Sequence, residues 1–158
     1  KDLTDTWVEA FAAGLGAAFP LRFGGKTGPA SGSPVDALVT VIGLARDATQ
    51  TYGATQSALG DLAAIRIGGV EVVLNSSRTQ ALGPELFTRV GIDPSVKKLL
   101  VLKSSNHFRA AYRPIIRGVL HIHSDGLLRR DDYRLIPYRH VQRPIWPLDA
   151  DAAGRLIA

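Results

Sequence analysis

Cysteine and methionine are both missing from this chain of 158 residues. Without cysteine there is no disulfide, no thiolate nucleophile and no cysteine-ligated zinc. No apolar run approaches the ~20 residues that cross a bilayer, and no secretory signal is present, so we expect no membrane contact. The compartment is left undetermined by these absences, and our working expectation is a cytoplasmic protein. Because Lys1 is no translation start, we expect a processed, truncated or excised part of a longer protein.

The familiar catalytic motifs are missing as well. The chain has no HExxH helix, no GxSxG elbow and no close pair of carboxylates. The run Gly24-Gly25-Lys26-Thr27 ends like a phosphate-binding loop, but Pro20 stands where the first glycine of that loop belongs, and prolines follow it. Lys26 could still act as a point charge in a glycine-rich loop near a ligand. The alternative is an ordinary connecting loop.

Positive charge is present in excess and is unevenly distributed. The formal net charge is +5, while residues 97–143 hold eleven Lys and Arg against three Asp. These cations are scattered singly among apolar residues, without an aromatic-interleaved RNA motif or helix-turn-helix spacing. We therefore expect a solvated face with a few anion contacts, and no nucleic-acid partner.

The apolar pattern predicts a single globular domain of mixed α/β class, with one or two small mixed sheets, over residues 1–158. With 46% hydrophobic and 21% charged residues, the chain is long enough to bury its own core. A stretch between the predicted strands, Arg46–Asp61, is polar, with turn signals at Tyr52-Gly53 and Gly60-Asp61. The predicted helices are Thr4–Ala18, Pro84–Val90 and His107–Arg113; the predicted strands are Phe19–Phe23, Val35–Leu44, Leu62–Ile67, Val70–Leu74, Leu99–Leu102 and Gly118–Ser124. The strands around Gly68-Gly69 form a predicted hairpin over residues 62–74.

The stretch Lys97–Pro114 carries the densest set of candidate site residues. An apolar strand is predicted to lead into a short helix that Asn106 caps and Pro114 closes. Free backbone N–H groups at such a junction, with the positive end of the helix, favour an anion. Donor side chains cluster there: Lys103, Ser104, Ser105, His107 and Arg109. The alternative is that these polar residues only cap the backbone.

Several short motifs together resemble the C-terminal domain of the MlrC family, which are microcystinase-C-like metallopeptidases. The motifs are Lys103-Ser104 with His107-Phe108-Arg109-Ala110, the lead Gly91-Ile92-Asp93-Pro94, Gly24-Gly25-Lys26-Thr27 with Gly32 and Pro34-Val35, Gly68-Gly69-Val70 with Ser77-Arg78-Thr79-Gln80, and Arg143-Pro144-Ile145-Trp146-Pro147-Leu148-Asp149. The resemblance runs from about residue 15 to residue 149. Where Gly28 and Ala30 stand here, the family pattern has polar residues.

The resemblance implies a division of labour between two domains. Zinc would be held mainly by an N-terminal domain outside this chain, and this domain would wall the cleft in which small peptides or related amides are hydrolysed. His107 would contact the substrate or its developing oxyanion, and the substrate-binding residues would be Lys103, Ser104, Asn106, Arg109, Lys26 and Arg78. The isolated chain is then not expected to be an active enzyme, and an oligomer is possible.

Two alternatives stay open. The chain could be a non-catalytic module that binds a small anion at the Asn106 helix start. It could instead hold its own metal, because His121, His123 and Asp125 fall on one face of a predicted strand. The competing interpretation is that these three residues form the wetter face of a half-buried strand beside a turn, with no further ligand nearby.

Overall fold

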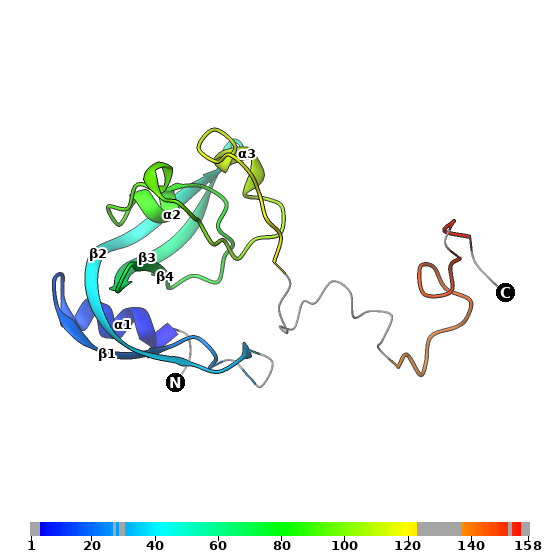
Figure 1. The fold of residues 1–158 in the computed structure, drawn as a ribbon, viewed down its shortest axis with the longest axis horizontal. Helices are drawn as coiled ribbons and strands as arrows, with labels where there is room; N and C mark the ends of the chain where they lie inside the picture. The colour runs from blue at the N-terminus through cyan, green and yellow to red at the C-terminus, as the bar shows by residue number, and fades with distance from the viewer. Residues whose placement is uncertain (1–3, 27, 29–30, 123–136, 152, 156–158) are drawn as a thin grey trace. The chain divides into compact units, whose positions relative to one another are not determined.

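The computed structural model describes residues 4–26, 28, 31–122, 137–151 and 153–155, which fall in two compact units, Lys1–His121 and Ile122–Ala158. In chain order, the elements of the first unit are α1 (Thr4–Ala13), β1 (Ala18–Phe23), β2 (Val35–Tyr52), β3 (Thr55–Ile67), β4 (Val70–Asn75), α2 (Glu85–Thr88), the 3-10 turn η2 (Pro94–Val96) and α3 (Arg109–Tyr112) (Figure 1). None of the described helices has the length and apolarity needed to cross a membrane.

A curved sheet organises the first unit. Its strands follow the order β1-β2-β3-β4, and each neighbouring pair is antiparallel. The chain thus combines a sheet with short helices, as predicted, but the sheet of the described residues is antiparallel and not mixed. The reason is local: consecutive strands are joined without a crossover element, which antiparallel pairing permits and parallel pairing does not.

The two central strands are longer than the pattern predicted. The polar stretch Arg46–Asp61 was expected to interrupt them, yet β2 and β3 pair along it, with their turn after Tyr52 as predicted. The Gly60-Asp61 signal marks a β-bulge instead of a turn. There the register shifts, Asp47 has φ +48 and the Asp61 carboxylate accepts the Asp47 N–H at 3.0 Å. The bulge absorbs the turn-forming residues without ending either strand.

The predicted hairpin over residues 62–74 is confirmed. Ile67 pairs with Val70, and the intervening Gly68 has φ +55, while Gly69 lies outside the left-handed region. A positive φ at the first central residue alone is the pattern of a type II′ turn.

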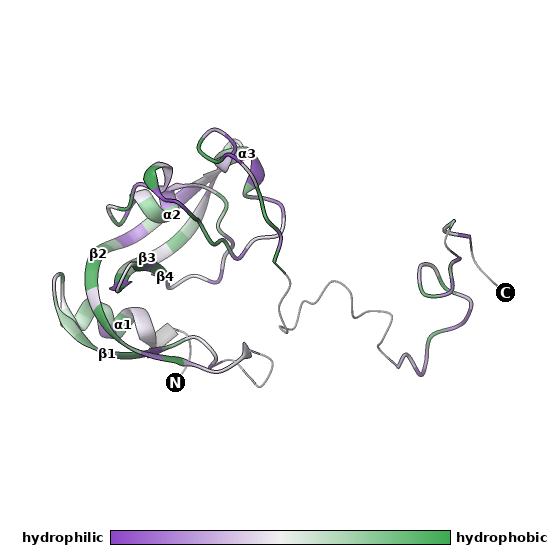
Figure 2. Ribbon diagram, in the orientation of Figure 1, coloured by the Kyte–Doolittle hydropathy of each residue, from purple (hydrophilic) through white to green (hydrophobic). Residues whose placement is uncertain are grey.

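Strand β3 is buried on both faces, which places one core on each side of the sheet. Ala63 and Ile65 pack with the α1 side, whereas Leu62 and Ala64 pack with the side that carries α2 and α3. Figure 2 shows the corresponding apolar colouring along the strands. The core on the side of α2 and α3 packs directly against the backbone of Gly43. A Cβ added at Gly43 would stand 2.1 Å from the Val90 carbonyl oxygen.

Several predicted elements are shorter than expected or missing, and of the predicted helix Pro84–Val90 only Glu85–Thr88 forms α2. The first helix ends at Ala13, not Ala18, because Gly14 turns with φ +85 while its N–H donates to the Ala10 carbonyl. The predicted strand Leu99–Leu102 has no ladder partner in the described part of the chain, although exposed and partly buried side chains alternate along it. Likewise, Gly118–Ile122, the described portion of the last predicted strand, forms no strand.

The second unit contains a compact proline-rich turn. Within Arg143–Asp149, the carboxylate of Asp149 accepts the Ile145 N–H at 2.7 Å and pairs with the Arg143 guanidinium. The backbone bond from Ile145, followed by the guanidinium, lowers the pKa of Asp149 below its ordinary range. This turn is therefore held by its own residues.

Candidate functional site

The buried amide of Gln50 anchors the candidate site to the sheet. Its side chain is fully buried on β2 and makes three hydrogen bonds to the loop after β4. Nε2 donates to the Gln80 carbonyl at 2.7 Å, and Oε1 accepts the N–H groups of Leu82 at 2.8 Å and Gly83 at 3.1 Å. Because a buried amide is costly unless its hydrogen bonds are made, these contacts fix the loop that carries Gln80.

The side chain of Gln80 then holds two of the predicted site residues. Its Oε1 accepts the Ser104 hydroxyl at 3.1 Å and lies 3.2 Å from Nδ1 of His107. The imidazole also meets the ring of Tyr52, at the end of β2, edge to face with centroids 5.7 Å apart. We call this group of Gln50, Tyr52, Gln80, Ser104 and His107 the Gln80 junction.

These contacts specify the His107 tautomer. An amide oxygen can only accept, so the proton lies on Nδ1. Nε2 is then left without a partner among the described residues, on an exposed side chain. The exposed ring is held in place by the amide and by the tyrosine, and it presents one free nitrogen outward.

Helix α3 begins two residues later than predicted. Its N-cap is Phe108, with no side-chain cap, and the helix covers only Arg109–Tyr112. Asn106 contributes its carbonyl, which accepts the Arg109 N–H at 3.1 Å, instead of a capping side chain. The buried rings of Phe108 and Tyr112 set this start, because they lie four residues apart on the core side. The prediction that Asn106 caps this helix is therefore wrong, and anion binding there stays a prediction.

Arg109 and His121 meet beside α3. The guanidinium Nη2 of Arg109 lies 2.8 Å from Nε2 of His121. Guanidinium nitrogens only donate, so this imidazole accepts at Nε2. Of the other predicted metal ligands, His123 and Asp125 lie outside the described residues. Residues 4–26, 28, 31–122, 137–151 and 153–155 contain no group of three side chains that could hold a metal ion.

The remaining predicted site residues are not gathered at the Gln80 junction. Lys26 lies on the loop after β1, at the end of the sheet opposite α3 (Figure 1), and its Nζ is 3.4 Å from the Thr6 hydroxyl. Lys103 and Arg78 are exposed, and neither side chain has a hydrogen-bond or ion-pair partner in the described part of the chain. The structure thus brings together Ser104 and His107, with Asn106 and Arg109 next to them in the chain.

The sequence analysis missed Gln50 and Tyr52 altogether, and it quoted Gln80 only within a motif. A usable signal was present in the sequence: Gln50 stands two residues from the apolar Ala48, which places both on the same face of a strand. A polar amide on a buried strand face must find partners, which points to a structural anchor. That signal was lost because Arg46–Asp61 was taken as a polar connection.

An antiparallel sheet with helices on both faces and a polar junction at one end defines a class of small α+β domain. This chain belongs to the MlrC C-terminus family, whose model matches residues 4–140. It is 34% identical over 139 residues to Microcystinase C of Sphingomonas sp., covering 88% of this chain and 26% of that protein. Its fold is similar to the crystal structure of a protein from Mesorhizobium sp. BNC1 that carries the provisional name of a metallopeptidase, with a TM-score of 0.75 and 23% identity, covering 95% of this chain and 30% of the other. The chain therefore spans between a quarter and a third of the length of both proteins.

Proposed function

We propose that this domain is the C-terminal part of a metal-dependent peptidase of the MlrC type and that it presents the Gln80 junction to a small peptide or related amide. The name of its Sphingomonas relative, a microcystinase, and the metallopeptidase name of its structural neighbour support the class of reaction. The observation that carries the proposal is the ring of His107, which is exposed yet fixed by Gln80 and Tyr52. Orienting contacts on one ring nitrogen are typical of histidines that work through the other.

The tautomer decides what His107 can do. With its proton on Nδ1, the neutral ring accepts a hydrogen bond at Nε2, for example from a substrate amide N–H. Donation to a carbonyl oxygen or an oxyanion requires the imidazolium form. Lys103 and Arg109 lie close to His107 in the chain, and we propose that their positive charge attracts a substrate carbonyl or carboxylate.

In this proposal, zinc is bound by residues outside this chain. The described residues hold no cluster of metal ligands, and Nε2 of His121 already faces Arg109. These residues therefore do not fit a metal centre, and we assign the metal to the N-terminal domain of the longer protein. The role of this domain is to bind and orient the substrate beside that centre.

The segment 97–103 offers a surface for that N-terminal domain. Leu100 and Leu102 pack on the core, whereas Leu99 and Val101 are each 76% exposed. Exposure alternates along the segment as it does on a strand, and the segment lacks a ladder partner within the described residues. Such an edge can add to a strand of another domain. Because the chain spans 26% of its Sphingomonas relative, the rest of such a protein is the partner we assign to it.

The test is His107→Asn in the longer protein. Asparagine can keep a donor near Gln80 Oε1, but it has no counterpart of Nε2. Peptide turnover should fall by at least ~10-fold, as for removal of a positioned polar group, while the unfolding temperature and zinc content stay near wild type. His140→Ala, an exposed histidine of the second unit, is the matched control and should keep wild-type turnover. Normal turnover in His107→Asn would contradict the proposal.

A further inference from the structure

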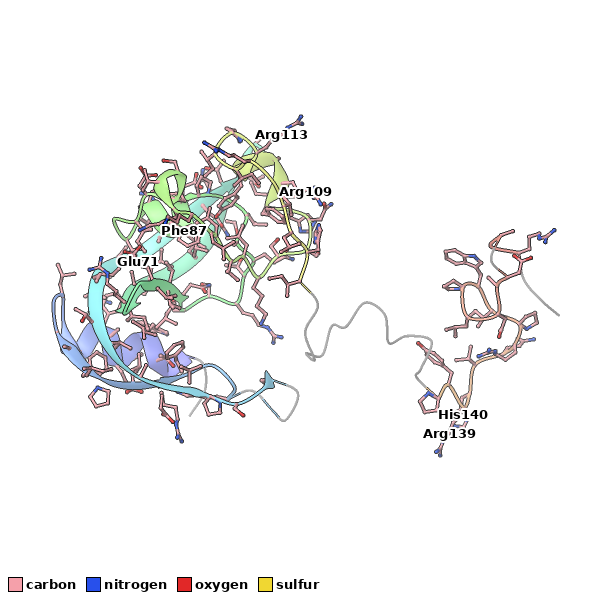
Figure 3. All side chains as sticks on the ribbon, in the orientation of Figure 1. Glu71, Phe87, Arg109, Arg113, Arg139 and His140 are labelled. Carbon is pink, nitrogen blue, oxygen red and sulfur yellow. The ribbon has the colours of Figure 1, made fainter. Side chains whose placement is uncertain are left out.

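A hollow lies against the C-terminal end of α3, apart from the Gln80 junction contacts. It is open to solvent, has a volume of ≈ 430 Å³ and is lined by Arg109, Arg113, Ile116, Arg117, Gly118 and Val119. We call it the arginine hollow. Figure 3 shows Arg109 and Arg113 at α3, and Figure 2 shows hydrophilic colouring on part of that helix. The buried rings of Phe108 and Tyr112 face the core, so the arginines of the same helix face outward.

The charge in this hollow is uncompensated by the described residues. Among the described residues, none of the ion pairs involves Arg109, Arg113 or Arg117. The partner of Arg109 is the ring of His121, a neutral acceptor. Arginine stays protonated at all relevant pH values, so three like charges share one concave surface. An anion between them would relieve their repulsion and satisfy their free N–H groups.

The rest of the lining is apolar and selects the kind of anion. Ile116 packs partly on the core, and Val119 is 40% exposed beside the arginines. The volume lies in the range of pockets that hold small organic ligands. A bare inorganic anion would use only the guanidinium groups, whereas an organic acid can also cover the apolar wall.

We propose that the arginine hollow binds a small organic carboxylate with an apolar stem, the carboxylate on the guanidinium forks and the stem against Ile116 and Val119. The planar fork of arginine matches the two oxygens of a carboxylate. Binding there does not depend on any role of His107, so the two proposals can fail separately.

The experiment titrates the 158-residue chain with N-acetyl-leucine and with the matched neutral compound N-acetyl-leucinamide, followed by the backbone amide NMR signals of residues 109–119. The acid should bind at least about tenfold more tightly than the amide, since it alone makes charged hydrogen bonds. Arg113→Ala combined with Arg117→Ala should weaken binding of the acid by about tenfold or more. Both side chains are exposed, so the unfolding temperature should not change.

Arg89→Ala is the matched control, because it removes an exposed arginine that does not line the hollow. It should keep wild-type affinity for N-acetyl-leucine. Equal binding of acid and amide, unchanged affinity in the double variant or an equal loss in Arg89→Ala would overturn the proposal. Inorganic phosphate that binds as tightly as N-acetyl-leucine would also overturn it, because the apolar wall would then contribute nothing.

Discussion

Tyr112 is the largest fully buried side chain among the described residues, and it ties α3 to the loop that carries the Gln80 junction. Its hydroxyl donates to the Gly83 carbonyl at 2.9 Å. Burial, followed by the nearby negative charge of Glu85, raises the pKa of this phenol above its ordinary value of about 10. The folded state therefore holds the neutral phenol.

The raised pKa of Tyr112 has a definite consequence at alkaline pH. A group whose pKa is higher in the folded state contributes stability that is fully present below its unfolded pKa and is lost as pH rises above it. The wild-type free energy of unfolding should fall above pH ~10 more steeply than that of Tyr112→Phe. At pH 7, the free energy of unfolding of the variant should be lower than that of the wild type by about 1 kcal/mol, because the variant lacks the hydrogen bond. Urea unfolding from pH 7 to pH 11 measures both, and parallel pH profiles would show that Tyr112 does not titrate this way.

Single residues also mark the limit of prediction from sequence. His107 and Ser104 were predicted to lie together because they are close in the chain, and the structure brings them to one amide. That amide, Gln80, lies more than twenty positions earlier, and its loop is held by a residue thirty positions before it. Contacts of that range depend on strand register, which residue chemistry alone does not supply.

At the scale of elements, the hairpin turn between β3 and β4 allows a matched test. Gly68 has φ +55 and Gly69 does not share this conformation, although a Cβ added at either would meet no atom within 4 Å. Gly68→Val should lower the unfolding temperature, because a β-branched residue resists the left-handed region. Gly69→Ala, at the second turn position, should leave it nearly unchanged. Thermal unfolding of both variants measures this, and equal melting temperatures would rule out the type II′ turn.

Variants in segment 97–103 test which of its side chains pack on the core and which are available to another domain. In the 158-residue chain, Leu99→Ser with Val101→Ser should barely change stability, because both side chains already face solvent. Leu100→Ser should be clearly destabilising, because Leu100 packs on the core. In the longer protein, the Leu99 and Val101 variant should lower the unfolding temperature as well. If it does not, the N-terminal domain does not cover this edge.

The elements show why some predictions from sequence held and others did not. The hairpin was predictable because its glycines and flanking β-branched residues act locally. The length of β2 was not, because Asp47 and Gly60 are turn formers that a bulge can also use. The apolar run Leu99–Leu102 predicted a strand, but an apolar run cannot show whether a ladder partner lies within reach.

At the scale of the whole molecule, the first unit folds around a sheet that has a core on each face. Two cores enclose the sheet, yet the described residues contain no metal cluster, and the Gln80 junction offers contacts instead of a nucleophile. Family membership could be predicted from short motifs, since the model of the family matches residues 4–140. The contacts of Ser104 and His107 with Gln80, and of His107 with Tyr52, could be learned only from the fold.

The most direct measurement is peptide hydrolysis by the purified 158-residue chain with added zinc, compared with the longer protein at equal concentration. The isolated chain should unfold in a cooperative thermal transition, because its cores are its own, and should show no turnover. The longer protein should hydrolyse the same peptide and lose that activity on metal removal. Zinc-dependent hydrolysis by the 158-residue chain alone would contradict the assignment of the metal centre to another domain.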